Sequence, residues 1–145
     1  MRGRVVVAAV LASAAFAALA ASGCGADCST QTPPIVSVPT CSGMAAGATV
    51  TVNVKVCPRC DQETPTCSVD LSEVSSGIIR LEPRSQVCNP RSSCPTVNPS
   101  SCPATGVDCT FTAPPPDNYS ILVVDENGQP TQQPFIVSGS ATTCG

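Results

Sequence analysis

Hydrophobic and polar residues alternate along several stretches of this chain, and residues 49–56 show the pattern most clearly. Val50, Val52, Val54 and Val56 alternate there with threonine, asparagine and lysine. A period of two turns the valines to one face of an extended chain and the polar residues to the other. The pattern therefore predicts a half-buried β-strand.

Six weaker runs predict further strands, at residues 35–38, 67–74, 77–82, 107–113, 119–124 and 134–138. The Asp125-Glu126-Asn127-Gly128 segment predicts a turn between the last two, since Asn-Gly readily adopts positive φ. No helix is expected after the N-terminal apolar run. Seven short strands with turn signals in about 110 residues resemble an immunoglobulin-like or fibronectin-type sandwich. The resemblance implies an all-β fold, a single seven-stranded sandwich preceded by a helical signal peptide. The tryptophan of true immunoglobulin domains is absent.

The N-terminus has the features of a signal peptide. Arg2 and Arg4 precede a 17-residue stretch, 5–21, that is apolar apart from Ser13. A transmembrane anchor is the alternative, but the stretch is short and rich in alanine for a hydrocarbon layer of about 30 Å. The basic start and the small residues at its end favour a signal peptide.

Two cleavage sites compete. Ala18-Leu19-Ala20 offers a site for ordinary signal peptidase, which would release a secreted chain starting at Ala21. Ala21-Ser22-Gly23-Cys24 resembles the lipobox of bacterial lipoproteins, although Ala21 stands where that family usually has leucine. The resemblance implies cleavage before Cys24, a diacylglycerol on its thiol and acyl chains such as palmitate. Gly25 follows, where aspartate would imply retention in the inner membrane, so the outer membrane of the cell envelope is favoured.

These features predict three regions. Residues 1–23 form the signal peptide, 24–34 a lipidated tether, and 35–145 a disulfide-stapled β-sandwich domain. A long loop over residues 83–106 interrupts the sandwich. It contains a repeated turn-forming unit that ends in Cys-Pro, first at 89–95 and again at 98–103.

Charge and composition exclude several functions. Once Arg2 and Arg4 are removed, five basic residues face ten acidic ones, for a net charge of −5. This balance argues against nucleic-acid binding and offers no polybasic patch for anionic lipid. The chain contains no histidine, the commonest general base and metal ligand. Only three aromatic residues, Phe111, Tyr119 and Phe135, remain for the core, so another source of stability is expected.

Cysteine is that source. The chain has 11 cysteines, a density that indicates an oxidising compartment. Assigning Cys24 to lipid leaves an even set for disulfides, namely Cys28, Cys41, Cys57, Cys60, Cys67, Cys88, Cys94, Cys102, Cys109 and Cys144. The connectivity stays open. Three of the ten lie in the long loop, so at least one must pair outside it. We expect its partner to be Cys109 or one of the cysteines between 57 and 67.

Cys57-Pro58-Arg59-Cys60 is the sharpest chemical motif. It matches the C-x-x-C of thiol–disulfide oxidoreductases, whose thiolate usually lies at a helix N-terminus. Here the motif ends a strand and enters an acidic, proline-interrupted segment, which disfavours a thiolate. Zinc bound by Cys57, Cys60, Cys67 and one later cysteine is a further alternative, but an exported chain would oxidise these thiols. No spacing selects a catalytic residue, a metal site or a cofactor.

The sequence thus predicts a non-catalytic lipoprotein of the cell envelope that acts as a binding or structural module. Its partners would be the membrane, through the lipid on Cys24, and an envelope protein or glycan. The loop over 83–106 is the expected contact surface, because loops on rigid scaffolds carry recognition. A thiol–disulfide redox protein that uses Cys57 and Cys60 is the alternative.

Overall fold

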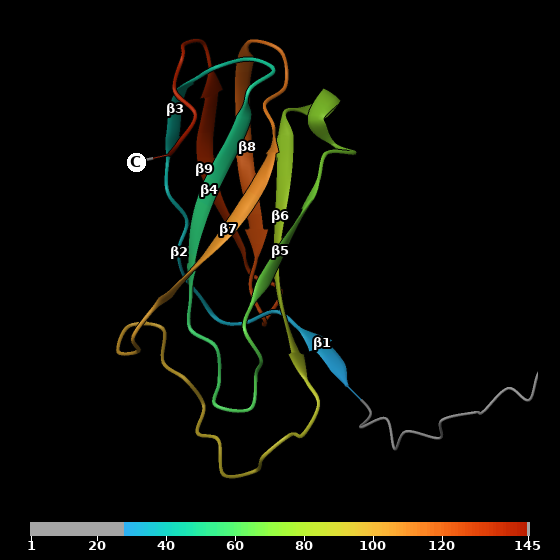
Figure 1. The fold of residues 1–145 in the computed structure, drawn as a ribbon, viewed down its shortest axis with the longest axis vertical. Helices are drawn as coiled ribbons and strands as arrows, with labels where there is room; N and C mark the ends of the chain where they lie inside the picture. Colours follow the sequence, from blue (N-terminus) through green and yellow to red (C-terminus); the bar gives the residue numbers. More distant parts are fainter. Residues whose placement is uncertain (1–27, 145) are drawn as a thin grey trace, which may run out of the picture.

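The computed structural model describes residues 28–144, which form nine β-strands and one short 3₁₀ helix. The fold is all-β over this range, and the strands belong to two sheets that share one core (Figure 1). The predicted signal peptide, its cleavage site and Cys24 lie outside the described residues.

The smaller sheet has three antiparallel strands. Strand β4 (Thr49–Val56) lies between β2 (Ile35–Ser37) and β7 (Thr105–Thr112). All four valines of β4 are 0% exposed, while the polar residues between them are exposed or half-buried. The half-buried strand predicted from the valine alternation is confirmed.

The larger sheet has six strands. Five pair in the order β1–β6–β8–β9–β3, and the sixth, β5, also pairs with β6. Their bounds are β1 Ser29–Gln31, β3 Cys41–Met44, β5 Thr66–Asp70, β6 Ile78–Val87, β8 Asp117–Val124 and β9 Pro130–Val137. Both β5 and β8 pair with Arg80 and Leu81 of β6, so they must lie on opposite edges of it.

Two strand pairs in the larger sheet are parallel, β6 with β8 and β3 with β9. After β4 the chain returns to this sheet at its outer strand β5 and turns back through the 3₁₀ helix into β6, and β6 runs in the same direction as β8 (Figure 1). The sheet is therefore mixed, whereas both sheets of immunoglobulin domains are antiparallel.

The two sheets pack through side chains on their facing sides. The Phe111 ring on β7 lies 5.4 Å from the Phe135 ring on β9, centroid to centroid. The Tyr119 ring on β8 lies 6.5 Å from Phe135. The three aromatic residues of the described chain thus form one cluster, in which the Phe111–Phe135 contact joins the two sheets. The Tyr119 hydroxyl also donates a hydrogen bond to the Pro115 carbonyl at 2.9 Å, which fixes the connection between β7 and β8.

The predicted turn at residues 125–128 joins β8 to β9. Gly128 has a φ of 78°, and the Asp125 carboxylate accepts hydrogen bonds from the backbone N–H groups of Asn127 and Gln129 at 2.8 and 2.7 Å. A tight turn with positive φ at glycine was the expectation, so this prediction is confirmed.

The strand count differs from the seven expected, because β1 and β3 lack an alternating apolar pattern. Strand β1 is fully exposed, and β3 contains Gly43, so neither has the pattern of a half-buried strand. The strand expected at 67–74 ends at Asp70, whose carboxylate accepts the Ser72 N–H at 2.9 Å and begins a turn. That turn leads into the 3₁₀ helix Val74–Ser76, in a region where no helix was expected.

The boundaries of the domain and of its long loop also differ from those expected. Residues 28–34, expected to be a tether, include β1, and Pro33 and Pro34 are buried. The long loop starts at residue 88 rather than 83, because β6 continues to Val87. Pro83 lies inside β6, and proline ordinarily argues against a paired strand, which explains why the sequence pattern ended too early.

The connections between strands gather at two ends of the sandwich. Loops 57–65 and 88–104 connect β4 to β5 and β6 to β7, and both project from the end that appears lowest in Figure 1. The β3–β4 turn, the 3₁₀ helix and the β7–β8 connection lie at the opposite end (Figure 1).

Candidate functional site

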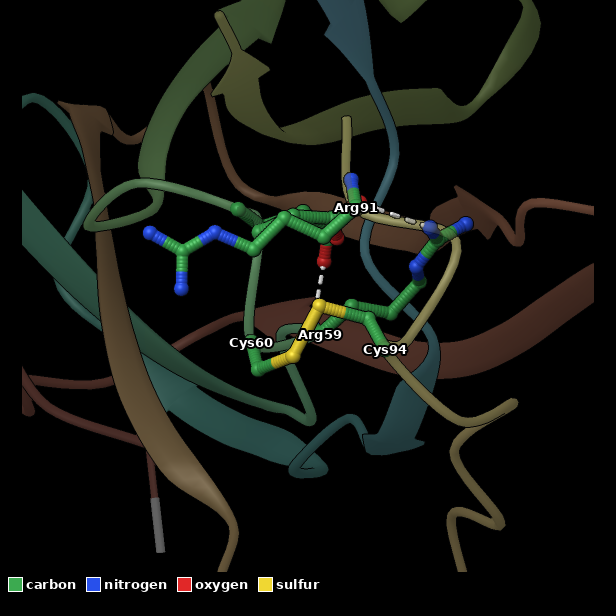
Figure 2. Close-up of a disulfide and its surroundings, with 6 residues drawn as sticks. Arg59, Cys60, Arg91 and Cys94 are labelled. Carbon is green, nitrogen blue, oxygen red and sulfur yellow. Dashed lines mark hydrogen bonds and ion pairs between the residues drawn. A yellow bond between two sulfur atoms is a disulfide. The ribbon is translucent and has the colours of Figure 1, made fainter. Parts of the chain in front are cut away.

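Loops 57–65 and 88–104, together with Cys28, form a surface that we call the disulfide-tied end. Three of the five disulfides lie in it: Cys28–Cys88, Cys57–Cys102 and Cys60–Cys94. Two of them join the two loops directly, and Figure 2 shows the Cys60–Cys94 bond between them. The third joins the start of the longer loop to the residue that precedes β1.

The other two disulfides hold the sandwich itself. Cys67–Cys109 joins β5 to β7 and so connects the neighbouring edges of the two sheets. Cys41–Cys144 joins β3 to the C-terminal segment. All ten cysteines expected to form disulfides are therefore paired.

The loop cysteines pair largely as expected. Cys94 and Cys102 bond to Cys60 and Cys57, within the range of partners that the sequence suggested. Cys88 pairs instead with Cys28, which the sequence had placed in the tether. The two cysteines of the C-x-x-C motif are thus each bonded to a distant residue rather than to one another.

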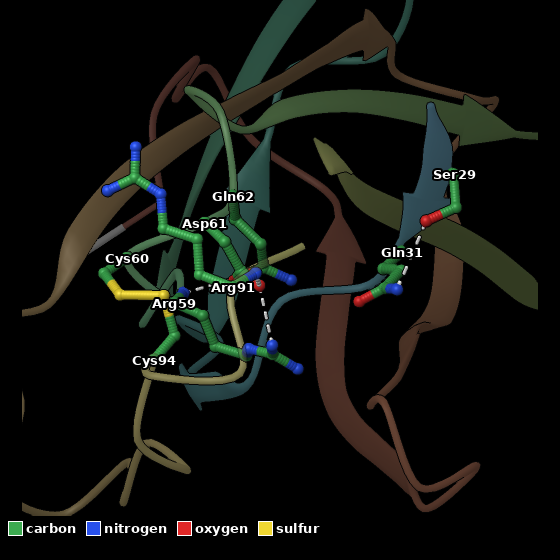
Figure 3. Close-up of polar contacts among 8 residues, drawn as sticks. All are labelled: Ser29, Gln31, Arg59, Cys60, Asp61, Gln62, Arg91 and Cys94. Atoms are coloured by element: carbon green, nitrogen blue, oxygen red, sulfur yellow. Dashed lines mark hydrogen bonds and ion pairs between the residues drawn. A yellow bond between two sulfur atoms is a disulfide. The ribbon is translucent and has the colours of Figure 1, made fainter. Parts of the chain in front are cut away.

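A buried carboxylate joins the two loops beside the Cys60–Cys94 bond. The Asp61 side chain is 0% exposed, and its Oδ2 accepts hydrogen bonds from Arg59 Nη2 at 2.8 Å and from the Arg91 backbone N–H at 3.2 Å (Figure 3). Burial by itself raises the pKa of Asp61. The hydrogen bond from the Arg91 N–H and the nearby Arg59 guanidinium outweigh that effect, so the pKa lies below its ordinary value of 3.8.

Backbone hydrogen bonds shape each loop further. In the shorter loop the Gln62 side chain accepts the Arg59 N–H at 2.7 Å. In the longer loop each copy of the sequence repeat contains one turn, with Cys94 N–H bonded to Arg91 C=O and Ser101 N–H bonded to Asn98 C=O, both at 3.0 Å. The repeat therefore encodes two successive turns, each close to a cysteine, so a long loop without sheet pairing still has a defined shape.

Charge is distributed unevenly between this end and the rest of the domain. The two loops carry Arg59 and Arg91 against Asp61 and Glu63, a net charge of zero. The whole excess of acidic residues lies elsewhere in the chain. The Arg91 guanidinium points away from Asp61 in Figure 3, and among the described residues it forms no ion pair.

Hollows in this part of the molecule are small and polar. One of about 200 Å³ lies between the two loops, beside Asp61 and Arg91. A larger one of about 390 Å³ lies on β6 near the 125–128 turn. The guanidinium groups of its two arginines donate hydrogen bonds to neighbouring side chains, Arg80 to Glu73, and Arg84 to Glu82 and Thr32.

Between residues 28 and 144, no group of three or more cysteine and acidic side chains is placed to hold a metal ion. Cys57, Cys60 and Cys67, the cysteines considered for zinc, are each bonded to a different cysteine. Over the same range, no helix has the length and hydropathy needed to cross a bilayer.

Sequence reasoning missed the contact between Asp61 and Arg91 and the role of Cys28. Asp61 directly follows the C-x-x-C motif, but nothing in its spacing indicates a partner 30 residues away.

A scan of protein-family models found no match to the chain, and searches of curated proteins and of solved structures found none either.

Proposed function

We propose that this protein is an exported lipoprotein of the bacterial cell envelope, anchored through Cys24, that acts without catalysis as a binding or structural module. The observation that carries the proposal is the disulfide network. Five disulfides in one small domain are typical of proteins exported from the reducing cytoplasm. With ten cysteines paired, Cys24 is the remaining one, and it ends the segment Ala21-Ser22-Gly23-Cys24, which resembles a lipobox.

The non-catalytic part of the proposal rests on the sequence, in which no residue spacing selects a catalytic site. Cys57 and Cys60 hold two loops together through separate partners. A binding or structural role uses these bonds as they stand, to keep a loop surface rigid.

The contact surface in this proposal is the disulfide-tied end. Its loops are long and rich in polar residues, and crosslinks and the buried Asp61 contact hold them in place. A surface ordered in advance loses less conformational entropy when it meets a partner.

We also propose that the sandwich is related in architecture to immunoglobulin-like domains. The support is Tyr119, whose hydroxyl bonds back to Pro115 at the corner between β7 and β8. A tyrosine corner of this kind marks the start of strand F in immunoglobulin-like sandwiches. The parallel β6–β8 pair departs from that topology, so the relationship concerns the packing of two sheets and not the strand order.

Mass spectrometry of the mature N-terminus tests the lipoprotein proposal. We expect a chain that starts at Cys24 and carries acyl mass, and we expect Cys24→Ala to lose that mass and leave the membrane fraction. Several acyl chains are needed for stable anchoring, at about 0.8 kcal/mol per buried methylene. A mature chain that starts at Ala21 without lipid would disprove the proposal and support plain secretion.

A further inference from the structure

The disulfide Cys28–Cys88 determines which end of the domain lies nearest to the proposed anchor. Cys88 is the first residue of loop 88–104, and Cys28 is bonded to it. Cys24 precedes Cys28 by four residues, and four extended residues span at most about 14 Å. The Cα atoms of Cys28 and Cys88 are 3.9 Å apart, so the Cα atom of Cys24 lies within about 18 Å of the point where the long loop begins.

The direction of β1 agrees with this placement. β1 is antiparallel to β6, and Ser29 pairs with Val87, the last residue of β6. The chain therefore enters the domain at the end where β6 finishes, which is the end from which both loops project (Figure 1). From there the eight-residue strands extend by about 26 Å toward the opposite end.

We infer that the disulfide-tied end faces the lipid headgroups of the membrane that holds the Cys24 anchor. The inference rests on the proposed lipidation and names what the proposed contact surface meets. The opposite end, with the β3–β4 turn and the β7–β8 connection, then faces away from the bilayer.

The charge of the longer loop is compatible with this orientation. The two loops are neutral overall, although the acidic Asp125-Glu126 turn lies at the same end of the sandwich, beside Gln31 and Thr32. From Cys88 to Val107 the chain contains no acidic residue, and Arg91 is exposed with its guanidinium directed away from the Asp61 contact (Figure 3). Arg91 is therefore available to lipid phosphate groups.

The composition of the loops indicates contact with headgroups rather than insertion into hydrocarbon. Serine, threonine, asparagine and proline dominate residues 88–104, and Val97 is half-buried. An interfacial segment that inserts presents a face of large apolar side chains, which these loops lack. The acyl chains provide the attachment, and the rigid loops set the orientation of the domain.

Energy transfer from two labelled positions to the membrane surface tests the orientation. A donor dye is attached through an azide-bearing residue at Ser93, in the long loop, or at Ala46, in the β3–β4 turn, so that the ten paired cysteines are untouched. Both positions are exposed. The full-length lipoprotein is reconstituted in vesicles of phosphatidylethanolamine and phosphatidylglycerol that contain an acceptor-labelled headgroup lipid. Given a separation of about 26 Å, we expect transfer from Ser93 to exceed transfer from Ala46 about twofold or more.

Acyl mass on Cys24 is measured in the same sample, so the two proposals fail in different ways. Equal transfer from both positions, or stronger transfer from Ala46, in a lipidated protein overturns the orientation alone. Absence of acyl mass overturns the lipoprotein proposal and the orientation with it.

A double variant, Cys28→Ser with Cys88→Ser, tests the role of the disulfide. Without this bond, the three-residue β1 and the hydrogen bond from the Cys57 N–H to the Pro34 carbonyl hold the N-terminal segment to the loop end. The freed tether would then extend from Cys24 to about Pro34, a reach of about 36 Å. We expect the difference between Ser93 and Ala46 to shrink while the circular dichroism spectrum of the sheets is retained. An unchanged difference would mean that the disulfide does not set the orientation.

Discussion

Asp61 accepts a hydrogen bond at 3.2 Å from the backbone N–H of Arg91, a residue 30 positions further along the chain. The contact joins two loops that also share the Cys57–Cys102 and Cys60–Cys94 disulfides. Covalent and electrostatic links thus reinforce one another at the same end of the sandwich. The combination explains how loops without sheet pairing present a defined surface.

The Asp61 contact makes the stability of the protein depend on pH. Because the pKa of Asp61 in the folded protein is below its ordinary value of 3.8, its ionised form stabilises the fold above that pH. The stabilisation is lost as the pH falls through the folded-state pKa. We therefore expect Asp61→Asn to lower the urea midpoint at pH 6 and to bring it closer to the wild-type midpoint near pH 2.

Asp70 is the matched comparison for this experiment. Its pKa is also lowered, by hydrogen bonds from the Ser72 backbone N–H and side chain, so it titrates in the same window. Asp70 lies far from the disulfide-tied end, at the end of β5. Asp70→Asn should therefore leave the Asp61 contribution in place. If Asp61→Asn and wild type lose stability in parallel between pH 6 and pH 2, the contact contributes nothing.

Neighbouring residues on β4 should respond very differently to the same substitution. Val52 is 0% exposed in the core, so Val52→Asp places an unpaired charge there and should cost about 3 kcal/mol or more. Thr51 lies on the outer face beside Thr110, and Thr51→Asp should change stability by less than about 1 kcal/mol. Thermal or urea unfolding measures both variants, and equal losses would contradict the assignment of faces.

The Tyr119 hydroxyl can be removed without removing the ring. Tyr119→Phe deletes the 2.9 Å hydrogen bond to the Pro115 carbonyl and keeps the packing against Phe135. An exposed hydrogen bond of this type contributes about 1 kcal/mol at most, so we expect a loss of up to that size in urea unfolding. Tyr119→Ala, which also loses the aromatic contact, should cost clearly more. A Phe variant as stable as wild type would show that the corner bond does not stabilise the fold.

Local sequence patterns determined a large part of this protein. The valines of β4 specify a half-buried strand because a period of two matches the pleat, and Asn127-Gly128 specifies a turn because the backbone needs positive φ there. The density and even number of the cysteines after Cys24 indicated a fully paired set. Each of these features depends on residues close together in the chain or on composition alone.

Only the tertiary structure decided the features that depend on distant partners. Strand β1 is polar and exposed and exists because it pairs with the end of β6. Pro83 lies within β6 because neighbouring strands hold the rest of that segment. The connectivity of the disulfides and the contact between Asp61 and Arg91 join residues 30 or more positions apart. Such contacts form once the sheets have packed and brought the loops together, and no local periodicity records which loops will meet.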